Sequence, residues 1–443
     1  MCLKADVVGN GGPPVKRRFP RLTCLLAVTL LPIVILGPAL GVPVPSAAGA
    51  PPLLILISMD GYRADYLDRS HSPVLAALAA DGVRAKGLRP AYPSLTFPNH
   101  YTIVTGLYPD EHGIVNNTMH DPVLGNFSPP NRVANTDGRW WDQAEPIWVT
   151  AQKQGRRTAS VYWPGTQAAI HGVLPTYWQL FDPSVSPDAR VDQVLAWLDL
   201  PTDQRPTFVS LYFEQVDVAG HNYGPDSLQV NEALVTIDAA LGRLVAGLRE
   251  RNQFDSANLI ILSDHGMRAS SPERLVLLDQ IVNPQHIELA SAIVNVGIDP
   301  KPGYAAEVER ALLAADGRPP HAHLHCWKKE HLPKKFHYGK NKRIPAIQCV
   351  AQDGWMVSTA AIESKRTQPL LGEHGYDSED PQMRAVFVAH GPSFKQHLTV
   401  PELDNVNVYV LLATLMGVQP LRNAGSPAAT AGMLRMVALP SNP

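Results

Sequence analysis

Acids and histidines follow several apolar segments of this chain at the point where each segment ends. These candidate metal ligands are Asp60, Asp217, His221, Asp264, His265 and His374. With 16 His and 40 Asp and Glu in the chain, one such residue alone would mean little. The pattern is more specific, because an Asp-x-x-x-His and a Ser-Asp-His-Gly sequence each follow an apolar run. Zinc takes about four ligands per ion, so six donors indicate two metal sites. Histidine nitrogens favour zinc or a similar transition metal over magnesium or calcium.

Thr96 is the best candidate for a nucleophile beside these metals. Two metal ions about 4 Å apart favour in-line displacement at phosphorus, because one of them activates the nucleophile. Thr96 lies in the turn-rich stretch 93–100, which leads into a helical pattern at 101–105. At the start of a helix, unpaired amides and the helix dipole would stabilise an alkoxide and phosphate oxygens. The residue type fits a plain helix N-cap equally well, so both interpretations stay open.

The elements that must position these residues are buried strands. Continuous apolar runs that are too short for buried helices are typical of strands covered on both faces. They occupy residues 53–57, 207–213, 259–262 and 385–389. Residues 228–248 have apolar side chains at three- and four-residue spacing, which predicts a helix between two of these strands. The alternation predicts a doubly wound α/β fold, whose ligands bind at the carboxyl ends of the strands.

Two segments are expected to be loops. Residues 116–148 are rich in Asn, Pro, Asp and Trp without a clear period, which indicates a loop or lid over the ligand-binding edge. We expect Trp140 and Trp141 to pack this lid rather than to stack on a substrate. The basic stretch 328–343 is expected to be a solvated loop or hairpin.

Residues 1–50 have the features of a signal peptide. Basic residues at 16–21 precede an apolar stretch at 22–40, and small residues at 46–50 would suit a signal peptidase. An uncleaved membrane anchor and a twin-arginine signal remain as alternatives. We therefore expect an exported protein, periplasmic or extracellular, with no membrane span once the signal is cleaved.

Residues 51–443 are expected to form one large domain, because no linker-like break interrupts them. The formal net charge of −2, with 18% charged residues, gives no overall field that would attract polyanions. Nucleic acid is therefore not expected as an obligate partner.

Cys326 and Cys349 are the only cysteines after residue 50. In an oxidising exterior they would form a disulfide, and two buried thiols are the alternative.

Nine short segments resemble the nucleotide pyrophosphatase/phosphodiesterase family of the alkaline phosphatase superfamily, in order and in spacing. They are Met59-Asp60-Gly61-Tyr62-Arg63, 93–100, Thr105-Gly106-Leu107-Tyr108-Pro109, 112–117, Trp163-Pro164-Gly165, 217–221, Tyr223-Gly224-Pro225, Ser263-Asp264-His265-Gly266-Met267 and Gly372-Glu373-His374-Gly375. The resemblance implies an alkaline-phosphatase-like α/β fold, with a central mostly parallel sheet flanked by helices and a lid insertion. It implies a bacterial-type catalytic domain alone, without cysteine-rich or nuclease-like modules and without a protein partner.

The same resemblance implies a role for each site residue. One Zn²⁺ would be held by Asp60, Thr96, Asp264 and His265, and a second by Asp217, His221 and His374. Asn117 would donate a hydrogen bond to a phosphate oxygen, where charge develops in the reaction, and a plain turn residue is its alternative. A nucleobase slot would be formed by Phe97, Tyr212 and Phe181, for which core packing is the alternative.

The implied activity is hydrolysis of nucleotide phosphodiester and pyrophosphate bonds. Zinc would lower the pKa of the Thr96 hydroxyl, the alkoxide would attack phosphorus, and water would release a nucleoside 5′-monophosphate from a phosphothreonine intermediate.

Sulfatases are excluded, because a threonine cannot become formylglycine. Phosphomonoesterases and phosphonoacetate-type hydrolases remain alternatives, although Trp163-Pro164-Gly165 offers no basic group for a monoester. A non-catalytic binding protein is disfavoured, because every ligand position is present. The physiological substrate, a nucleotide or another phosphodiester, and the oligomeric state stay open.

Overall fold

The apolar runs of the sequence form neighbouring strands of one central sheet. The computed structural model describes residues 52–314 and 321–435. Strand β1 (Leu54–Met59) pairs in parallel with β8 (Phe208–Phe213) on one side and with β9 (Asn258–Leu262) on the other. Beyond β8 the sheet continues in parallel through β6 (Thr158–Val161) to β7 (Tyr177–Trp178).

The sheet changes direction on the other side of β9. Strand β18 (Phe387–His390) runs antiparallel to β9 and to β2 (Val83–Ala85), and β19 (Leu398–Val400) pairs in parallel with β2. The strand order is β19-β2-β18-β9-β1-β8-β6-β7. The predicted α/β fold with a mostly parallel central sheet is therefore confirmed.

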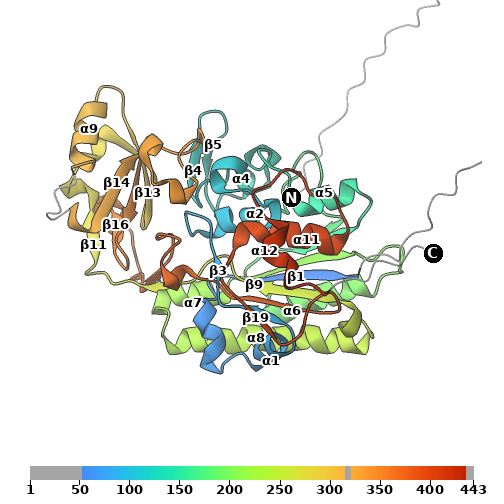
Figure 1. Cartoon of the computed structure of the whole chain (residues 1–443). Coiled ribbons are helices and arrows are strands. Elements are labelled where there is room, and N and C mark those ends of the chain that lie inside the picture. Colours follow the sequence, from blue (N-terminus) through green and yellow to red (C-terminus); the bar gives the residue numbers. More distant parts are fainter. Residues whose placement is uncertain (1–51, 315–320, 436–443) are drawn as a thin grey trace, which may run out of the picture. The chain divides into compact units, whose positions relative to one another are not determined.

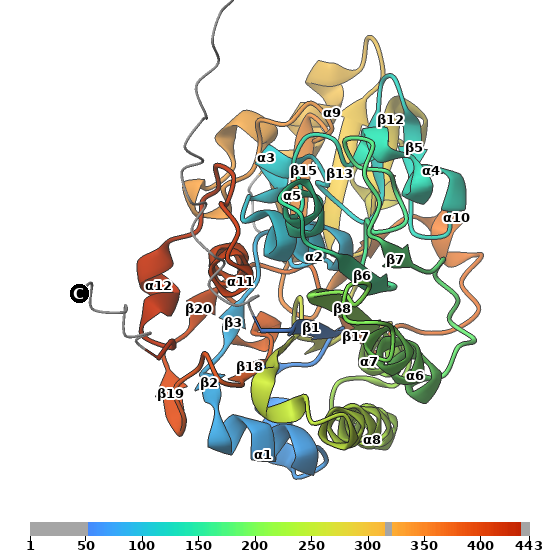
Figure 2. The same cartoon turned by 90° about the vertical axis from the view of Figure 1, so that its right-hand side faces the viewer.

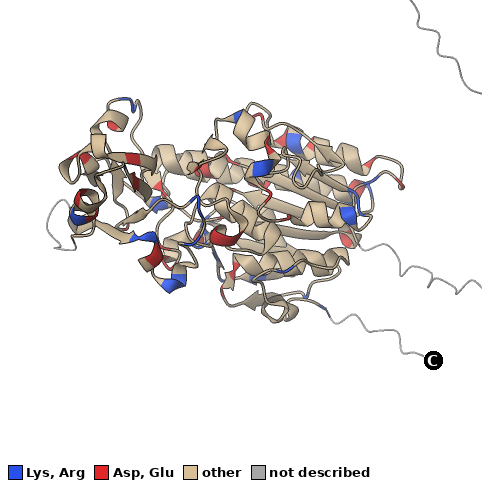
Figure 3. Ribbon diagram, turned by 90° about the horizontal axis from the view of Figure 1, so that it is seen from above, with Lys and Arg blue, Asp and Glu red and all other residues tan. Residues whose placement is uncertain are grey.

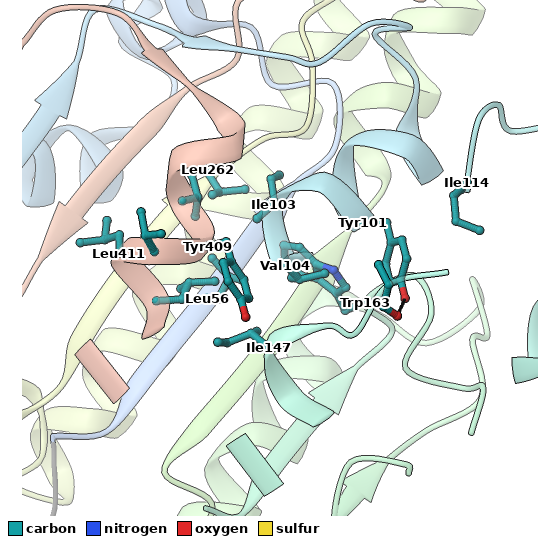
Figure 4. Packing of buried hydrophobic residues seen from close by; sticks show 14 of the residues in the cluster. Leu56, Tyr101, Ile103, Val104, Ile114, Ile147, Trp163, Leu262, Tyr409 and Leu411 are labelled. Carbon is teal, nitrogen blue, oxygen red and sulfur yellow. Dashed lines mark hydrogen bonds between the residues drawn. The ribbon is translucent and has the colours of Figure 1, made fainter. Parts of the chain in front are cut away.

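Helices cover both faces of this sheet, which explains why its strands are apolar throughout (Figures 1 and 2). One face packs against α2 (Thr96–Thr105), α5 (Ile147–Lys153) and α11 (Val408–Met416), and the other against α1 (Pro73–Asp81), α6 (Pro187–Leu198) and α8 (Leu228–Glu250). Leu54 and Leu56 point to the first face, where Leu56 lies near Ile103, Ile147 and Leu411 (Figure 4). Ile55 and Ile57 point to the second face. Burial of each such side chain stabilises the fold by about 1.5–3 kcal/mol.

Helix α8 begins where the chain supplies a cap. The Ser227 hydroxyl accepts a hydrogen bond from the Val230 amide at 3.2 Å, which satisfies one of the free amides of the first turn. The apolar positions that predicted this helix are buried against the sheet.

A second, antiparallel sheet is built from residues 287–351. Its strands are β12 (Ile287–Ser291), β13 (Asn295–Pro300), β15 (Ile347–Ala351) and β14 (Leu324–Lys328), in that order, and α9 (Ala305–Leu312) packs on it. Cys326 and Cys349 are opposite each other on β14 and β15 and form a disulfide, as expected.

Short elements fill the connections. They are β3 (Leu88–Arg89) with β20 (Leu403–Asp404), β11 (Leu275–Leu277) with β16 (Met356–Ser358), β10 (Arg268–Ala269) with β17 (Gly372–Glu373), α3 (Pro109–His112), α7 (Gln215–Tyr223), α10 (Ala360–Glu363) and α12 (Pro427–Ala431).

The segment 116–148 has more structure than a loop. It contains the hairpin of β4 (Met119–Asp121) and β5 (Gly125–Phe127), followed by α4 (Arg132–Thr136). Trp140 and Trp141 are 1% and 0% exposed within the core beneath it, so they pack this segment as expected.

The basic stretch 328–343 is not solvated throughout, which corrects the expectation from its charge. Arg343 is 3% exposed, and its guanidinium donates to Asp121 Oδ2 at 3.0 Å and to the carbonyls of Gly113 and Trp140. This arginine joins the 116–148 segment to the chain that leads into β15. A charge count could not reveal the pairing, because its partner lies more than two hundred residues away in the sequence.

The described residues, 52–314 and 321–435, belong to one compact unit. The expected signal peptide at 1–50 lies outside the described residues. Within the described part of the chain, every helix is too short or too polar to cross a membrane.

Acidic and basic residues are interspersed over the ribbon, in agreement with the small net charge (Figure 3).

Candidate active site

The carboxyl ends of β1, β8 and β9 bring the predicted ligands together. Asp60 follows β1, Asp217 lies in α7 just after β8, and Asp264 follows β9. Gly61 makes the close approach possible, since it adopts φ +69° and a Cβ there would lie 2.8 Å from Asp217 Cα. Only glycine tolerates both the conformation and the contact.

Asp60, Thr96, Asp264 and His265 form a first cluster around one imidazole nitrogen. His265 Nε2 lies 3.0 Å from Asp264 Oδ2 and 3.4 Å from Asp60 Oδ1. The Thr96 hydroxyl lies 3.3 Å from the same nitrogen. A serine or threonine acting as a helix cap would use its hydroxyl to hold backbone amides, but here Leu95 is the cap residue and Thr96 is the first residue of α2. The N-cap interpretation of Thr96 is therefore wrong.

Asp217, His221 and His374 form a second cluster beside the first. His221 is one helical turn after Asp217 on α7, with Nε2 3.4 Å from Asp217 Oδ2. His374 Nε2 lies 3.2 Å from His221 Nε2 and 3.5 Å from Asp217 Oδ1. The His265 and His374 rings stack with centroids 3.6 Å apart, which makes the two clusters contiguous.

The three predicted histidine ligands share one hydrogen-bonding pattern. The Nδ1 atoms of His221, His265 and His374 lie 2.8, 2.9 and 2.8 Å from the carbonyls of Gly372, Gly266 and Ser94. A carbonyl accepts only, so each Nδ1 holds a proton, and in the neutral imidazole that binds a metal each Nε2 has a lone pair directed into the clusters. Backbone carbonyls orient metal-binding histidines in this way in many metalloproteins.

His100 lies in the same region but has no free nitrogen. Asp60, His100 and Asp264 offer atoms within 4.8 Å of one another, as do Asp217, His265 and His374. However, His100 Nε2 contacts the Ser58 hydroxyl at 2.8 Å and its Nδ1 contacts the Thr96 carbonyl at 2.8 Å. This imidazole therefore supports the start of α2.

The chemistry of these donors fits metal cations. Asp60 Oδ1, Asp217 Oδ1 and Asp264 Oδ2 are buried and have no hydrogen-bond partner among the described residues. Buried carboxylate oxygens are normally hydrogen-bonded or bound to metal, since leaving them unpaired costs several kcal/mol. The mixture of carboxylate oxygens and imidazole nitrogens suits zinc or a similar ion.

The pKa shifts of the clustered acids and histidines also favour a bound cation. Burial, followed by the charges of Asp264 and Asp217, raises the pKa of Asp60 well above its usual value. Burial alone would lower the pKa of His221, but Asp217 and Glu373 outweigh it and raise that pKa to about 10. Burial alone would raise the pKa of Asp264, but His265 and His100 outweigh it and hold that pKa well below its usual value. The acidic groups therefore attract positive charge into this site.

The start of α2 is held by Asn117. Asn117 Oδ1 accepts a hydrogen bond from the Phe97 amide at 2.8 Å, which leaves the Asn117 NH₂ group for the cavity that both residues line. Thr96 is in the first turn of α2, beside the free backbone amides of that turn. The Thr96 hydroxyl is therefore near two kinds of hydrogen-bond donor, the Asn117 NH₂ group and the amides of the helix N-terminus.

A cavity of about 550 Å³ opens over both clusters. Its lining combines polar groups at the clusters with apolar walls, which is typical of a small-molecule site. Residues from the predicted slot line it: Phe97, Phe181 and Tyr212. Tyr212 has a second role, because its hydroxyl donates to Asp60 Oδ2 at 2.6 Å. Phe181 is held by a hydrogen bond from its amide to Gln167 Oε1.

Several residues of the site were not predicted. Glu373 Oε1 lies 3.4 Å from His221 Nδ1, and its position beside His374 was the only signal in the sequence. Arg190 is fully buried and pairs with Glu214 while donating to the Tyr212 carbonyl, and no motif marks it. The 116–148 segment contributes Arg132 and Asn135 to the cavity wall, as expected of a lid.

The sequence matches a family profile described as "Type I phosphodiesterase / nucleotide pyrophosphatase" over residues 54–377. The chain is 39% identical over 382 residues to the ectonucleotide pyrophosphatase/phosphodiesterase family member 3 of Bos taurus, covering 85% of this chain and 43% of the bovine protein. It is 39% identical over 380 residues to venom phosphodiesterase 2 of Crotalus adamanteus, covering 84% of this chain and 46% of the venom protein. The chain thus spans about half the length of the curated relatives it matches.

A solved structure has the same fold. The murine ectonucleotide pyrophosphatase/phosphodiesterase 5, studied as an inactive threonine-to-alanine variant in complex with AMP, superposes with a TM-score of 0.81 at 34% identity. The match covers 87% of this chain and 100% of the murine one. From the profile match and the shared architecture, the chain belongs to the type I phosphodiesterase/nucleotide pyrophosphatase family.

Proposed function

We propose that this chain hydrolyses nucleotide phosphodiester and pyrophosphate bonds through Thr96 and releases nucleoside 5′-monophosphates. The main support is the position of the Thr96 hydroxyl, 3.3 Å from His265 Nε2 at the start of α2 and in the wall of the cavity. The hydroxyl therefore belongs to the first ligand cluster and lies in the wall of the cavity that residues of the second cluster also line. Alternatives on the same site are a phosphomonoesterase and a phosphonoacetate-type hydrolase.

We assign two Zn²⁺ ions to the clusters. Asp60, Thr96, Asp264 and His265 would hold one ion, and Asp217, His221 and His374 the other. Zinc supplies Lewis-acid stabilisation of the attacking and leaving oxygens and lowers the pKa of a bound hydroxyl. The unpartnered carboxylate oxygens and the directed Nε2 atoms support this assignment.

The protein's own groups would act as follows. The Thr96 oxygen attacks phosphorus in line, and the leaving alcohol or phosphate departs from the opposite side. The NH₂ group of Asn117 donates to a phosphate oxygen where charge develops. A phosphothreonine results, and water attacks it from the side that the leaving group vacated. The bond between Thr96 and phosphorus breaks, and the monophosphate leaves.

The aromatic walls support a nucleotide substrate. Phe97 and Phe181 line the cavity from separate elements, and stacking of a base on such rings contributes about 1–3 kcal/mol. Two relatives support the assignment: a murine one was solved with AMP after a threonine-to-alanine substitution had inactivated it, and a snake protein is named a phosphodiesterase.

We extend the proposal to the organisation of the chain. Residues 1–50 would be a cleaved signal peptide, and residues 51–443 the catalytic domain. The protein would then be exported to the periplasm or the exterior. The names of the relatives, an ectoenzyme and a venom enzyme, support export.

The proposal is tested by comparing hydrolysis of p-nitrophenyl thymidine 5′-monophosphate with that of p-nitrophenyl phosphate, using zinc-loaded protein. We expect a strong preference for the diester, and its loss in the Thr96→Ala variant. The matched control is Thr236→Ala, since Thr236 is exposed on α8 away from the cavity. A preference for the monoester would reassign the chain to the phosphatases. Full activity of Thr96→Ala would remove Thr96 from the reaction.

A further inference from the structure

The cavity over the ligand clusters has one unpaired cation in its described wall. Arg132 is the single arginine or lysine among the described residues that line the cavity. It is exposed, and its guanidinium makes no hydrogen bond or ion pair with any residue that the structure describes. Most arginines on this protein are paired, as Arg139 is with Asp137 nearby on the same segment. An unpaired guanidinium in the wall of a substrate cavity is available for a ligand.

Arg132 lines the same cavity as the slot residues Phe97, Phe181 and Tyr212. It is close enough to Asp182 to help hold the pKa of that carboxyl below its usual value, after the hydrogen bonds from Ser184. Asp182 directly follows Phe181, whose ring lines the slot. Arg132 and Phe181 thus line the same cavity, and a base that stacks on Phe181 would come within reach of Arg132.

The segment presents Arg132 from a fixed turn. Asn131 caps α4 by accepting from the Ala134 amide at 3.2 Å. Asn135 Nδ2 donates to the carbonyls of Ser128 and Pro129 at 3.1 and 2.9 Å. Asn135 and Thr136 line the cavity together with Arg132, so this face of α4 turns toward the cavity.

We propose that Arg132 selects the base of the nucleotide and favours guanine over adenine. This inference rests on the proposed phosphodiesterase function. A guanidinium has only donors, in a planar fork that matches the O6 and N7 acceptors of guanine. Adenine presents its N6 amino donor in place of O6, so it loses one of the two hydrogen bonds and faces a donor with a donor. The Arg132 fork therefore recognises 6-oxopurine nucleotides at the outer edge of the slot.

A contact from Arg132 to a distant phosphate group is the competing assignment, and the two differ in their dependence on the base. A phosphate contact would raise kcat/KM equally for the guanosine and adenosine esters, because both carry the same phosphate. Contact with the base edge raises kcat/KM more for the guanosine ester than for the adenosine ester.

The test measures kcat/KM for the p-nitrophenyl esters of guanosine and adenosine 5′-monophosphate. Wild type should prefer the guanosine ester by about tenfold, the scale of one bidentate pair. Arg132→Gln should remove the guanosine preference, because a glutamine amide matches adenine rather than guanine, while Arg139→Gln, an exposed control on the same segment, should keep the wild-type ratio. Calorimetric affinities for GMP and AMP should change in parallel, and thermal unfolding would verify that each variant is folded.

Two outcomes would overturn the assignment. One is equal use of the two esters by wild type, and the other is a guanosine preference that survives in Arg132→Gln. Bis(p-nitrophenyl) phosphate, which has no base, keeps this result separate from the proposed function. If wild type hydrolyses that diester but shows no guanosine preference, only the role of Arg132 is contradicted. If wild type does not hydrolyse that diester, the phosphodiesterase function itself is contradicted.

Discussion

The hydroxyl of Tyr212 donates a hydrogen bond to Asp60 Oδ2 across 2.6 Å. The two residues belong to adjacent parallel strands, Tyr212 within β8 and Asp60 directly after β1. The same tyrosine ring lines the proposed slot. The proposed slot and the proposed metal site therefore share a side chain, and the predicted role of Tyr212 in the slot is incomplete without its contact to Asp60.

Replacing Tyr212 by phenylalanine keeps the ring and removes the donor. We expect zinc affinity to fall by about tenfold, because hydrogen bonds to a metal-binding carboxylate orient it. Competition with a fluorescent chelator measures this directly. Tyr162→Phe is the matched control, since Tyr162 lines the same cavity without a hydrogen bond to Asp60. Unchanged zinc affinity in Tyr212→Phe would restrict Tyr212 to the slot.

Removal of metal should destabilise the folded protein. Asp60, Asp217 and Asp264 each have a buried oxygen without a hydrogen-bond partner among the described residues, so a bound cation compensates a cost that the apoprotein must bear. A ligand present at about one hundred times its Kd stabilises the native state by about 2.7 kcal/mol. Differential scanning calorimetry with and without a chelator should show a lower Tm for the apoprotein, restored by zinc. An identical Tm would argue that the clusters bind no metal.

The buried His112 should make stability depend on pH. Burial lowers the pKa of His112 from its ordinary value of 6.5 to about 3. Above pH 6.5 neither state binds the proton, whereas below it the unfolded chain binds a proton that native His112 does not, so stability falls as pH falls from 6.5 toward 3. At about pH 4.5 the loss from this group is roughly 2–3 kcal/mol relative to neutral pH.

Urea unfolding of wild type and His112→Gln at both pH values measures this effect. The variant should lose less stability on acidification, because glutamine does not titrate and the contributions of all other groups cancel in the difference. His120→Gln, at an exposed position, is the control and should behave as wild type. Equal pH dependence in wild type and His112→Gln would refute the assignment.

The disulfide should stabilise the small sheet. Cys326 and Cys349 are 23 residues apart, and closure of a loop of that size in the unfolded chain contributes about 3 kcal/mol. The Cys326→Ser, Cys349→Ser double variant should therefore unfold at a lower urea concentration than oxidised wild type. Reduced wild type should match the double variant. If reduction leaves the unfolding midpoint unchanged, the cross-link contributes nothing to stability.

The fold, the six acid and histidine candidates and Thr96 followed from local patterns in the sequence, whereas Asn117 and the slot residues came from the family resemblance. Strands β1, β8 and β9 are apolar over their full length because helices cover both faces, and the acids after them converge because parallel strands end at one edge. Contacts between distant segments left no such pattern. The Asp121–Arg343 pair, the Tyr212–Asp60 hydrogen bond and the carbonyl partners of the histidines depend on tertiary packing alone.

The stereochemical course of hydrolysis tests the central claim, reaction through Thr96, most directly. A single diastereomer of p-nitrophenyl thymidine 5′-phosphorothioate, hydrolysed in heavy-oxygen water, yields a chiral product whose configuration at phosphorus can be determined. Attack by Thr96 followed by attack of water gives two in-line inversions, so the account predicts net retention. Net inversion would mean that water attacks the substrate directly, and it would contradict a phosphothreonine intermediate.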